Sequence, residues 1–302
     1  MKLVLRGHPL DPGRGRPIVM GILNASPESF SDGPPVARAT GALVERGHAL
    51  ATAGAHLIDV GGESGVTNRA PIAADEEIER AVPVIEELAS EGIATSIDTW
   101  KVEVAAAALD AGAVLVNDVS GLRDPALADA VAEARAGLVI THTRAEPKMK
   151  AFPPYDDVAA DCEAFLRERV AVAVGRGVDP DQIVLDPGPD LAKTPADTVA
   201  ALRALSRLAE LGHPLLLAVS RKDFVGAITG RRPLDRLPGT LAALAAGLDA
   251  GADIVRVHDV AEVSDFLRVR AALRGDEQLP ADLRLAEGLL REDLEEQEEP
   301  AA

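Results

Sequence analysis

The stretch IDVGGESGVTNRAP, which runs from Ile58 to Pro71, begins as a buried strand and ends as a polar loop. Its first residues are apolar, a carboxylate stands at Asp59, and Gly61 with Gly62 then break the strand pattern. The same arrangement, an apolar run that finishes in polar side chains, recurs along the chain. This recurrence decides the predicted fold.

Eight short apolar runs rich in β-branched residues are predicted to be strands. They are PIVMGILN (17–24), HLIDVGG (56–62), ATSIDT (94–99), VLVNDVSG (114–121), GLVITHT (137–143), QIVLDPG (182–188), PLLLAVSRK (214–222) and DIVRVHD (253–259). The segments between them have helical periodicity, and several stop at a glycine just before the next strand, namely Gly54, Gly92, Gly112, Gly177, Gly212 and Gly251. Apolar strands alternating with helices indicate a parallel sheet covered on both faces, and eight such units fit a single-domain α/β (β/α)8 TIM barrel. The alternative is an open doubly wound sheet, but none of the eight runs has the pattern of a polar edge strand.

The two ends of the chain differ in composition from the barrel. Residues 1–16 are predicted to form an N-terminal strand or hairpin that plugs the bottom of the barrel, and residues 17–274 form the barrel itself. Residues 275–302 are predicted to form a short amphipathic helix followed by an acidic tail.

Composition excludes several classes of protein. A net charge of −18 without a Lys/Arg-rich run argues against nucleic-acid binding and against an anionic membrane surface. We find neither a signal peptide nor an apolar run of about 18 residues, and Cys162 is the single cysteine, so we expect a soluble cytoplasmic protein. Cys162 lies in a helical pattern and is expected to fill core space.

All eight predicted strands end in polar side chains. These are Asn24, Asp59, Asp98 with Thr99, Asn117 with Asp118, Thr141 with His142, Asp186, Ser220 to Lys222, and Arg256 with His258. In a parallel barrel all the carboxyl ends of the strands surround one mouth, so we predict a single pocket there. For Asp118 alone, a role in a turn is an equally good interpretation.

Four of these side chains suit a flat heterocycle. Asp98, Asn117, Asp186 and Lys222 place carboxylates, an amide and an ammonium at the bottom of an apolar barrel, where they need partners. A ring with N–H donors and ring acceptors along one edge would satisfy them, and Arg256 could stack its guanidinium on that ring. The alternative is an internal ion-pair network that only stabilises the barrel.

The first and last strands are neighbours in a closed barrel, and their ends suit an anion. Asn24, Arg256 and His258 could bind it with or without a divalent cation. The chain has no zinc-ligand spacing, no P-loop motif and no G-x-S-x-G nucleophile motif.

Seven motifs together resemble those of the dihydropteroate synthase family of the pterin-binding superfamily. MGILNASPESFSDG is similar to the first-strand signature of that family, and IDVGGES, SIDT, NDVSG, LDPG, SRK and RVHDV follow in the family's order. The resemblance runs from about Val19 to about Val263. It implies a transferase of folate biosynthesis that condenses 6-hydroxymethyl-7,8-dihydropterin diphosphate with p-aminobenzoate to give dihydropteroate and pyrophosphate. It also implies Mg²⁺ and a homodimer.

The resemblance implies a role for each matching residue. The pterin-binding residues are Asp98, Asn117, Asp186, Lys222 and Arg256; of these Asp98, Lys222 and Arg256 are the expected catalytic residues. The expected diphosphate contacts are Asn24, Arg256 and His258, with Asn24 also the Mg²⁺ ligand.

The chain departs from the family pattern on the side where the family places the aminobenzoate. Gly65 and Val66 stand where the family has Thr/Ser and Arg, Asp190 and Leu191 replace Gly and Phe, and Asp223 follows SRK. Two added acids would repel the carboxylate of an aminobenzoate unless a cation such as Arg69 answers them.

The expected acceptor-side residues are therefore Thr67, Arg69, Leu191 and Asp223. These departures leave two alternatives open. One is a pterin-binding paralogue with a different acceptor or without the synthase step, and the other is a methyltransferase-type domain that binds a reduced folate.

Overall fold

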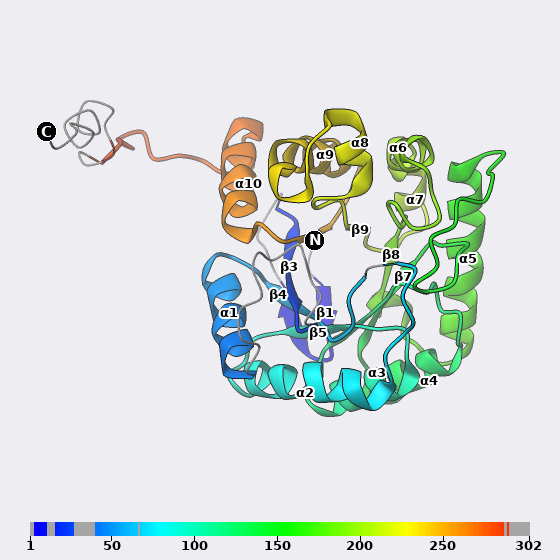
Figure 1. Cartoon of the computed structure of the whole chain (residues 1–302). Helices are drawn as coiled ribbons and strands as arrows, with labels where there is room; N and C mark the ends of the chain where they lie inside the picture. The colour runs from blue at the N-terminus through cyan, green and yellow to red at the C-terminus, as the bar shows by residue number, and fades with distance from the viewer. Residues whose placement is uncertain (1–2, 11–15, 27–39, 66, 287–288, 290–302) are drawn as a thin grey trace, which may run out of the picture.

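A barrel of eight parallel strands stands at the centre of the molecule (Figure 1). The computed structural model describes residues 3–10, 16–26, 40–65, 67–286 and 289. The barrel strands are β3 (Ile18–Asn24), β4 (Leu57–Gly61), β5 (Thr95–Asp98), β6 (Leu115–Asp118), β7 (Gly137–Thr141), β8 (Ile183–Asp186), β9 (Leu216–Leu217) and β10 (Ile254–Val257). Each lies within one of the eight predicted runs, so that prediction is confirmed.

The sheet is a nearly closed barrel and not an open doubly wound sheet. Its strand order is β8-β7-β6-β5-β4-β3-β10-β9. The two outermost strands approach each other through a parallel bridge between Leu185 and Leu215, and the Leu185 amide donates to the Pro214 carbonyl at 2.9 Å. The carboxyl ends of all eight strands therefore point to one mouth.

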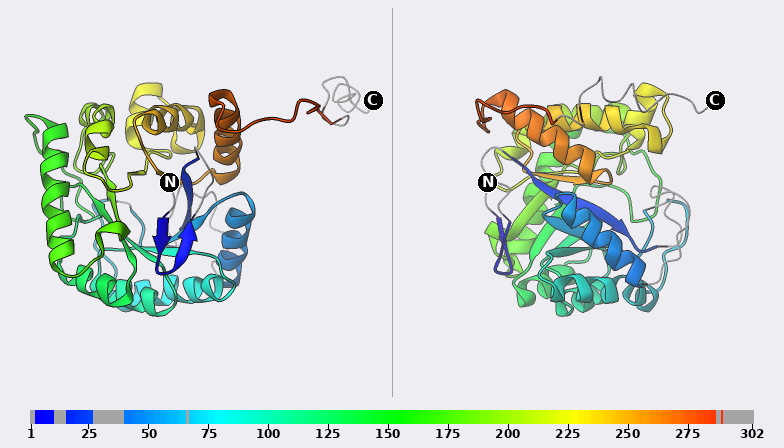
Figure 2. Two further views of the ribbon diagram at one scale, coloured as in Figure 1. Left: turned by 180° about the vertical axis from the view of Figure 1, so that it is seen from behind. Right: turned by 90° about the vertical axis from the view of Figure 1, so that its left-hand side faces the viewer.

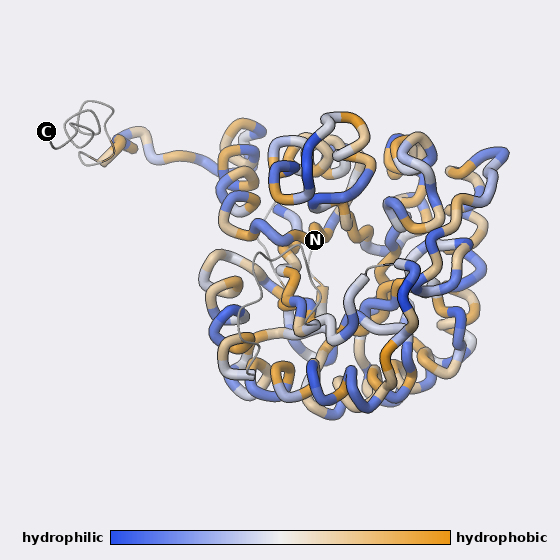
Figure 3. Tube along the Cα trace, in the orientation of Figure 1, coloured by the Kyte–Doolittle hydropathy of each residue, from blue (hydrophilic) through white to orange (hydrophobic). Residues whose placement is uncertain are grey.

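The helices form a ring outside the strands (Figures 1 and 2). They are α1 (Thr40–Thr52), α2 (Ala74–Ser90), α3 (Val102–Asp110), α4 (Ala126–Ala134), α5 (Val158–Gly175), α6 (Pro195–Arg203), α7 (Leu205–Ala209), α8 (Asp223–Thr229), α9 (Leu237–Asp249) and α10 (Val260–Arg274), with short 3₁₀ turns η2 (Pro180–Gln182) and η3 (Pro233–Asp235). Hydrophobic and hydrophilic residues alternate along them, as expected for helices with one buried face (Figure 3). The six glycines predicted to end helices all have positive φ, between 81° and 111°. Cys162 is buried in α5, as predicted.

An N-terminal hairpin seals the amino end of the barrel, as predicted. Strands β1 (Leu3–Leu5) and β2 (His8–Leu10) pair antiparallel, and their buried leucines pack against the first residues of several barrel strands. Figure 2 shows the hairpin at that end. Gly137 permits this approach, because a Cβ there would lie 2.6 Å from side-chain carbons of Leu5 and Leu115.

The predicted C-terminal helix is wrong for the part that the structure describes. Helix α10 ends at Arg274, Gly275 follows with φ of 76°, and residues 276–286 contain no helix. Leu279, Leu283 and Leu285 are exposed, so an amphipathic helix here would have no surface on which to bury its apolar face. The predicted acidic tail lies outside the described residues. Among the described helices, none has the length and apolarity needed to span a bilayer.

Candidate active site

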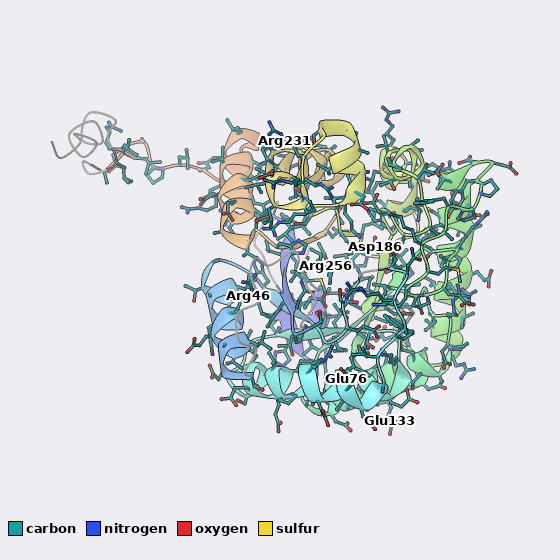
Figure 4. All side chains as sticks on the ribbon, in the orientation of Figure 1. Arg46, Glu76, Glu133, Asp186, Arg231 and Arg256 are labelled. Carbon is teal, nitrogen blue, oxygen red and sulfur yellow. The ribbon has the colours of Figure 1, made fainter. Side chains whose placement is uncertain are left out.

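The predicted pocket exists at the carboxyl ends of the strands. A cavity of about 660 Å³ is lined by all five residues predicted to bind the pterin, Asp98, Asn117, Asp186, Lys222 and Arg256. Figure 4 labels Asp186 and Arg256 near the centre of the ring, well inside the outer helices that carry Glu76 and Glu133. The barrel therefore brings together residues that lie more than 150 positions apart in the sequence.

The floor of this cavity is an ion-pair network centred on Arg256. The Arg256 Nε donates to Asp59 Oδ2 at 2.6 Å, and its Nη2 donates to Asp98 Oδ2 at 2.5 Å. Asp59 is fully buried and also accepts from Ser96 Oγ at 2.6 Å and from Asn117 Nδ2 at 3.1 Å. The ion-pair network proposed as an alternative is thus present, but three of its residues, Arg256, Asp98 and Asn117, also line the cavity.

Asp59 is one of the functional residues that the sequence analysis did not assign to the site; Glu63, Trp100 and Lys148, which line the cavity, are others. Asp59 was identified as the polar end of β4 but was not assigned to the site. The signal was its position at the end of a strand, two residues before Gly61, since a buried carboxylate in a closed barrel needs a cation or hydrogen-bond donors. Asp59 fixes the orientation of both Arg256 and Asn117.

Burial changes the protonation of the two cavity carboxyls. Desolvation, aided by the nearby carboxylates of Asp59 and Glu77, raises the pKa of Asp98 to about 7 against the opposing charges of Arg256 and Lys222. Desolvation also raises the pKa of Asp186, although Gly188 donates its amide to Asp186 Oδ1 at 2.7 Å. Both carboxyls would gain from a ligand that presents N–H donors.

The residues predicted to bind an anion lie beside β10. His258 Nδ1 and Ser220 Oγ form a hydrogen bond of 3.0 Å, in which the tautomer of His258 decides which of the two atoms donates. Burial and then the positive charges of Arg221, Arg256, Lys222 and Arg46 lower the pKa of His258 to about 3, so the ring is neutral at pH 7. Neutral His258 in a cationic surrounding suits an anionic ligand.

Asn24 ends β3 next to this region, with its Oδ1 facing Gly61. Neither Asn24 nor His258 lines the cavity itself. Most of the stretch that follows Asn24 lies outside the described residues.

Asp190 and Asp223, the two added acids on the acceptor side, both accept hydrogen bonds from other residues of the chain. Asp190 Oδ2 accepts from the amides of Asp223 and Phe224 at 2.5 and 3.3 Å, and its Oδ1 accepts from Thr198 Oγ1 at 3.2 Å. Asp223 Oδ1 accepts from Arg236 Nη1 at 3.1 Å. The cation that answers Asp223 is therefore Arg236 and not Arg69, and Asp190 is occupied as a cap on α8.

The other expected acceptor-side residues divide into two groups. Thr67, Leu191 and Asp223 line the cavity. Arg69 is exposed and is not part of the cavity wall. Val66 lies outside the described residues.

Three further strand-end residues do not face the cavity. Asp118 accepts from the amides of Ser120 and Leu122 at 2.7 and 2.5 Å, so of the two interpretations the turn role is the one observed. Thr141 and His142 are fully buried, and His142 Nε2 lies 2.8 Å from Asp161 Oδ1 on α5. The expectation that all eight strand ends meet in the pocket was too broad.

Lys193 fixes the loop after β8. Its ammonium is buried and donates to the carbonyls of His142, Gly188 and Leu191 at 3.2, 3.0 and 3.2 Å. Burial lowers the pKa of Lys193 to about 8. The loop that carries Asp190 and Leu191 is thereby held against β7.

A parallel (β/α)8 barrel with acidic, amide and cationic side chains around one cavity defines the class: an enzyme of the TIM-barrel type that binds a small polar molecule. Residues 20–258 match the family model described as pterin binding enzyme. The chain is also 40% identical over 258 residues to a dihydropteroate synthase of Bacillus subtilis, covering 85% of this chain and 88% of the relative.

Two solved structures show the same architecture. Dihydropteroate synthase of Xanthomonas albilineans with 4-aminobenzoic acid is 41% identical, with a TM-score of 0.83 over 92% of this chain and 99% of that one. The same enzyme in complex with 7,8-dihydropteroate is 41% identical, with a TM-score of 0.81 over 93% and 100% of the two chains. The chain belongs to the dihydropteroate synthase family of pterin-binding enzymes.

Proposed function

We propose that this chain condenses 6-hydroxymethyl-7,8-dihydropterin diphosphate with p-aminobenzoate to give dihydropteroate and pyrophosphate, a step of folate biosynthesis. The observation that carries the proposal is the cavity in which Asp98, Asn117, Asp186, Lys222 and Arg256 converge, in a chain that belongs to this family. The contacts of Asp190 and Asp223 within the chain support aminobenzoate as the acceptor, because Arg236 balances the charge of Asp223 and backbone amides stabilise that of Asp190.

The chemistry needs charge stabilisation and not a protein nucleophile. The bond between the pterin methylene carbon and the diphosphate oxygen breaks, and its electron pair leaves with pyrophosphate. The methylene cation that develops is delocalised into the pterin ring. The arylamine nitrogen supplies its lone pair to form the new C–N bond and then loses one proton.

The chain's residues have distinct roles in this proposal. The Asp98 and Asp186 carboxylates accept from the pterin N–H groups and stabilise the developing positive charge, since fixed charges in a desolvated site need no reorganisation. Asn117 and Lys222 complete the polar edge, and Arg256, fixed by Asp59 and Asp98, packs on the ring.

The leaving group is assigned to Asn24, Arg256 and His258. Mg²⁺ usually keeps several waters and binds through one or two protein oxygens together with substrate phosphates. The Asn24 carboxamide oxygen fits that requirement, and the described residues hold no acidic cluster that would bind the ion without substrate. When bound, Mg²⁺ would neutralise the charge of the departing diphosphate.

A direct assay tests the proposal. Purified protein is mixed with the pterin diphosphate, Mg²⁺ and p-aminobenzoate, and dihydropteroate and pyrophosphate are measured in equal amounts. Asp186→Asn should reduce turnover about 100-fold or more, whereas Glu133→Gln, on the exposed outer face of α4, should have native activity. Pterin binding without any turnover would refute the proposed function.

The homodimer remains a prediction from the family resemblance, and the cytoplasmic location remains a prediction from the sequence. Light scattering of the purified chain tests the first, and fractionation of cells that express it tests the second.

A further inference from the structure

Four side chains of alternating charge form a row beside the cavity. Lys101 Nζ lies 2.6 Å from Glu77 Oε2 and 2.7 Å from Glu63 Oε2, and Lys148 Nζ lies 3.2 Å from Glu63 Oε1. The exposed fractions of these side chains are only 0% for Glu77, 14% for Lys101, 3% for Glu63 and 7% for Lys148. Because the charges alternate and are shielded from water, each one depends on its neighbours in the row.

Lys148 is the only member of this row that comes from the far side of the mouth. Glu63 follows β4, whereas Lys148 follows β7, and β5 and β6 stand between those two strands. The Lys148 ammonium also donates to the carbonyl of Ser64. The pair therefore joins the second loop (residues 62–73) to the fifth loop (residues 142–157).

The backbones of the two loops are joined at the same point. The Asn68 amide donates to the Lys148 carbonyl at 2.7 Å, and the Lys150 amide donates to Asn68 Oδ1 at 3.4 Å. Asn68 and Lys148 both have positive φ, 60° and 67°. Positive φ costs energy at a lysine, so the backbone conformation of Lys148 is one that its surroundings must impose.

The joined loops form one wall of the cavity. Glu63, Gly65 and Thr67 of the second loop line it, as do Lys148 and Met149 of the fifth. Trp100, the single tryptophan, lines the cavity next to the row, with its ring 5.2 Å from Lys101 Nζ. The ammonium of Lys148 is thus committed to holding the two loops together.

We propose that Lys148 is a positioning residue that fastens the fifth loop to the second loop through Glu63 and so fixes the wall at the acceptor end of the cavity. The proposal rests on the proposed function, because it assigns that wall to the aminobenzoate. Without the ammonium, Glu63 keeps Lys101 and the Ile72 amide, and the second loop keeps only the bonds of Asn68 across the mouth. The pterin residues on the barrel floor keep all their own contacts.

The predicted consequence is selective. Lys148→Met keeps the length of the side chain but removes the charge, and we expect KM for p-aminobenzoate to rise about tenfold or more. KM for the pterin diphosphate and kcat should stay within about twofold, since a wall that binds ground state and transition state alike affects KM alone. Lys148→Arg keeps a cation that can pair with Glu63 and should restore most of the affinity.

Two controls separate this role from general loss of stability. Arg167→Met makes the same kind of change in an exposed ion pair with Glu163 on α5 and should leave both KM values unchanged. Hydrogen exchange should accelerate in residues 63–70 and 144–152 of the Lys148→Met chain, with no change in the barrel strands, and Trp100 fluorescence should shift.

The outcomes distinguish the proposed role of Lys148 from the proposed function of the chain. The role of Lys148 would be refuted, and the function left intact, if the native enzyme is active but Lys148→Met changes neither KM for p-aminobenzoate nor hydrogen exchange in the two loops. Absence of activity in the native chain would overturn the proposed function, and the exchange measurement would then still decide whether the two loops are fastened.

Discussion

The buried carboxylate of Asp59 gives the sharpest test of the site, because it holds Arg256 without being exposed to substrate or solvent. We predict that Asp59→Asn lowers the free energy of unfolding by about 3 kcal/mol. Removing one partner of a buried ion pair costs about 3–5 kcal/mol. The lower end applies here because Arg256 keeps its bond to Asp98, and because asparagine keeps an oxygen for the Ser96 hydroxyl.

Denaturant unfolding measures this loss directly, and thermal unfolding should show a decrease in Tm of about 6 °C. Ser96→Ala removes a different bond to Asp59 without changing the charge, so it should cost only about 1 kcal/mol. Asp59→Asn should also change the pKa of Asp98. The Asp59 charge contributes to the raised pKa of Asp98, so its removal leaves Arg256 to act on Asp98 with less opposition and lowers that pKa.

A double-mutant cycle decides whether Asp59 acts through Arg256. If it does, Asp59→Asn in an Arg256→Gln background should cost much less than in the native chain. The reasoning would be refuted if the two changes added to within about 0.5 kcal/mol, which is the behaviour of independent sites.

Two further predictions follow from the same pocket. The pKa of Asp98 is raised to about 7, so its carboxyl stays protonated to a higher pH than usual, and kcat/KM should fall as the pH is lowered below about 7. Asp98→Asn should weaken pterin binding and remove this decrease at low pH. A native pH profile that is flat through pH 7 would contradict the assignment. Lys193→Met should lower the free energy of unfolding by about 3 kcal/mol, because three carbonyls lose their shared donor. Denaturant unfolding measures this loss. An unchanged denaturant concentration at the midpoint of unfolding would contradict the prediction and show that water replaces the ammonium.

The fold was predictable because each barrel strand carries its own signal. Short runs such as HLIDVGG and DIVRVHD are apolar over the buried strand and polar where the strand leaves the core, and Gly54 and Gly251 mark the turns before them. These signals are local, so they need no knowledge of distant residues. The C-terminal helix was predicted from the same kind of local pattern but is absent from the described residues 276–286, because a helix also needs a surface to pack on.

The pocket was predictable only as a set of residues around one mouth. The parallel topology places Asp98, Asn117 and Asp186 at the mouth of the barrel, and their side-chain contacts are not needed to predict this position. Which groups pair with each other depends on the paths of loops and on side-chain directions, which no spacing in the sequence encodes. For that reason Arg236 as the partner of Asp223, Asp190 as a helix cap, and Lys148 as the partner of Glu63 were not foreseen.

The hairpin at the amino end of the barrel has a consequence for where the folding unit begins and ends. The residues recognisable as the family run from 20 to 258, yet Leu3, Leu5 and Leu10 fill the barrel below that span, and Val263 and Leu267 of α10 cover it from beyond the other limit. A chain trimmed to its recognisable part would expose both apolar surfaces to water. The folded unit therefore includes the hairpin and helix α10, which both lie outside the span that matches the family.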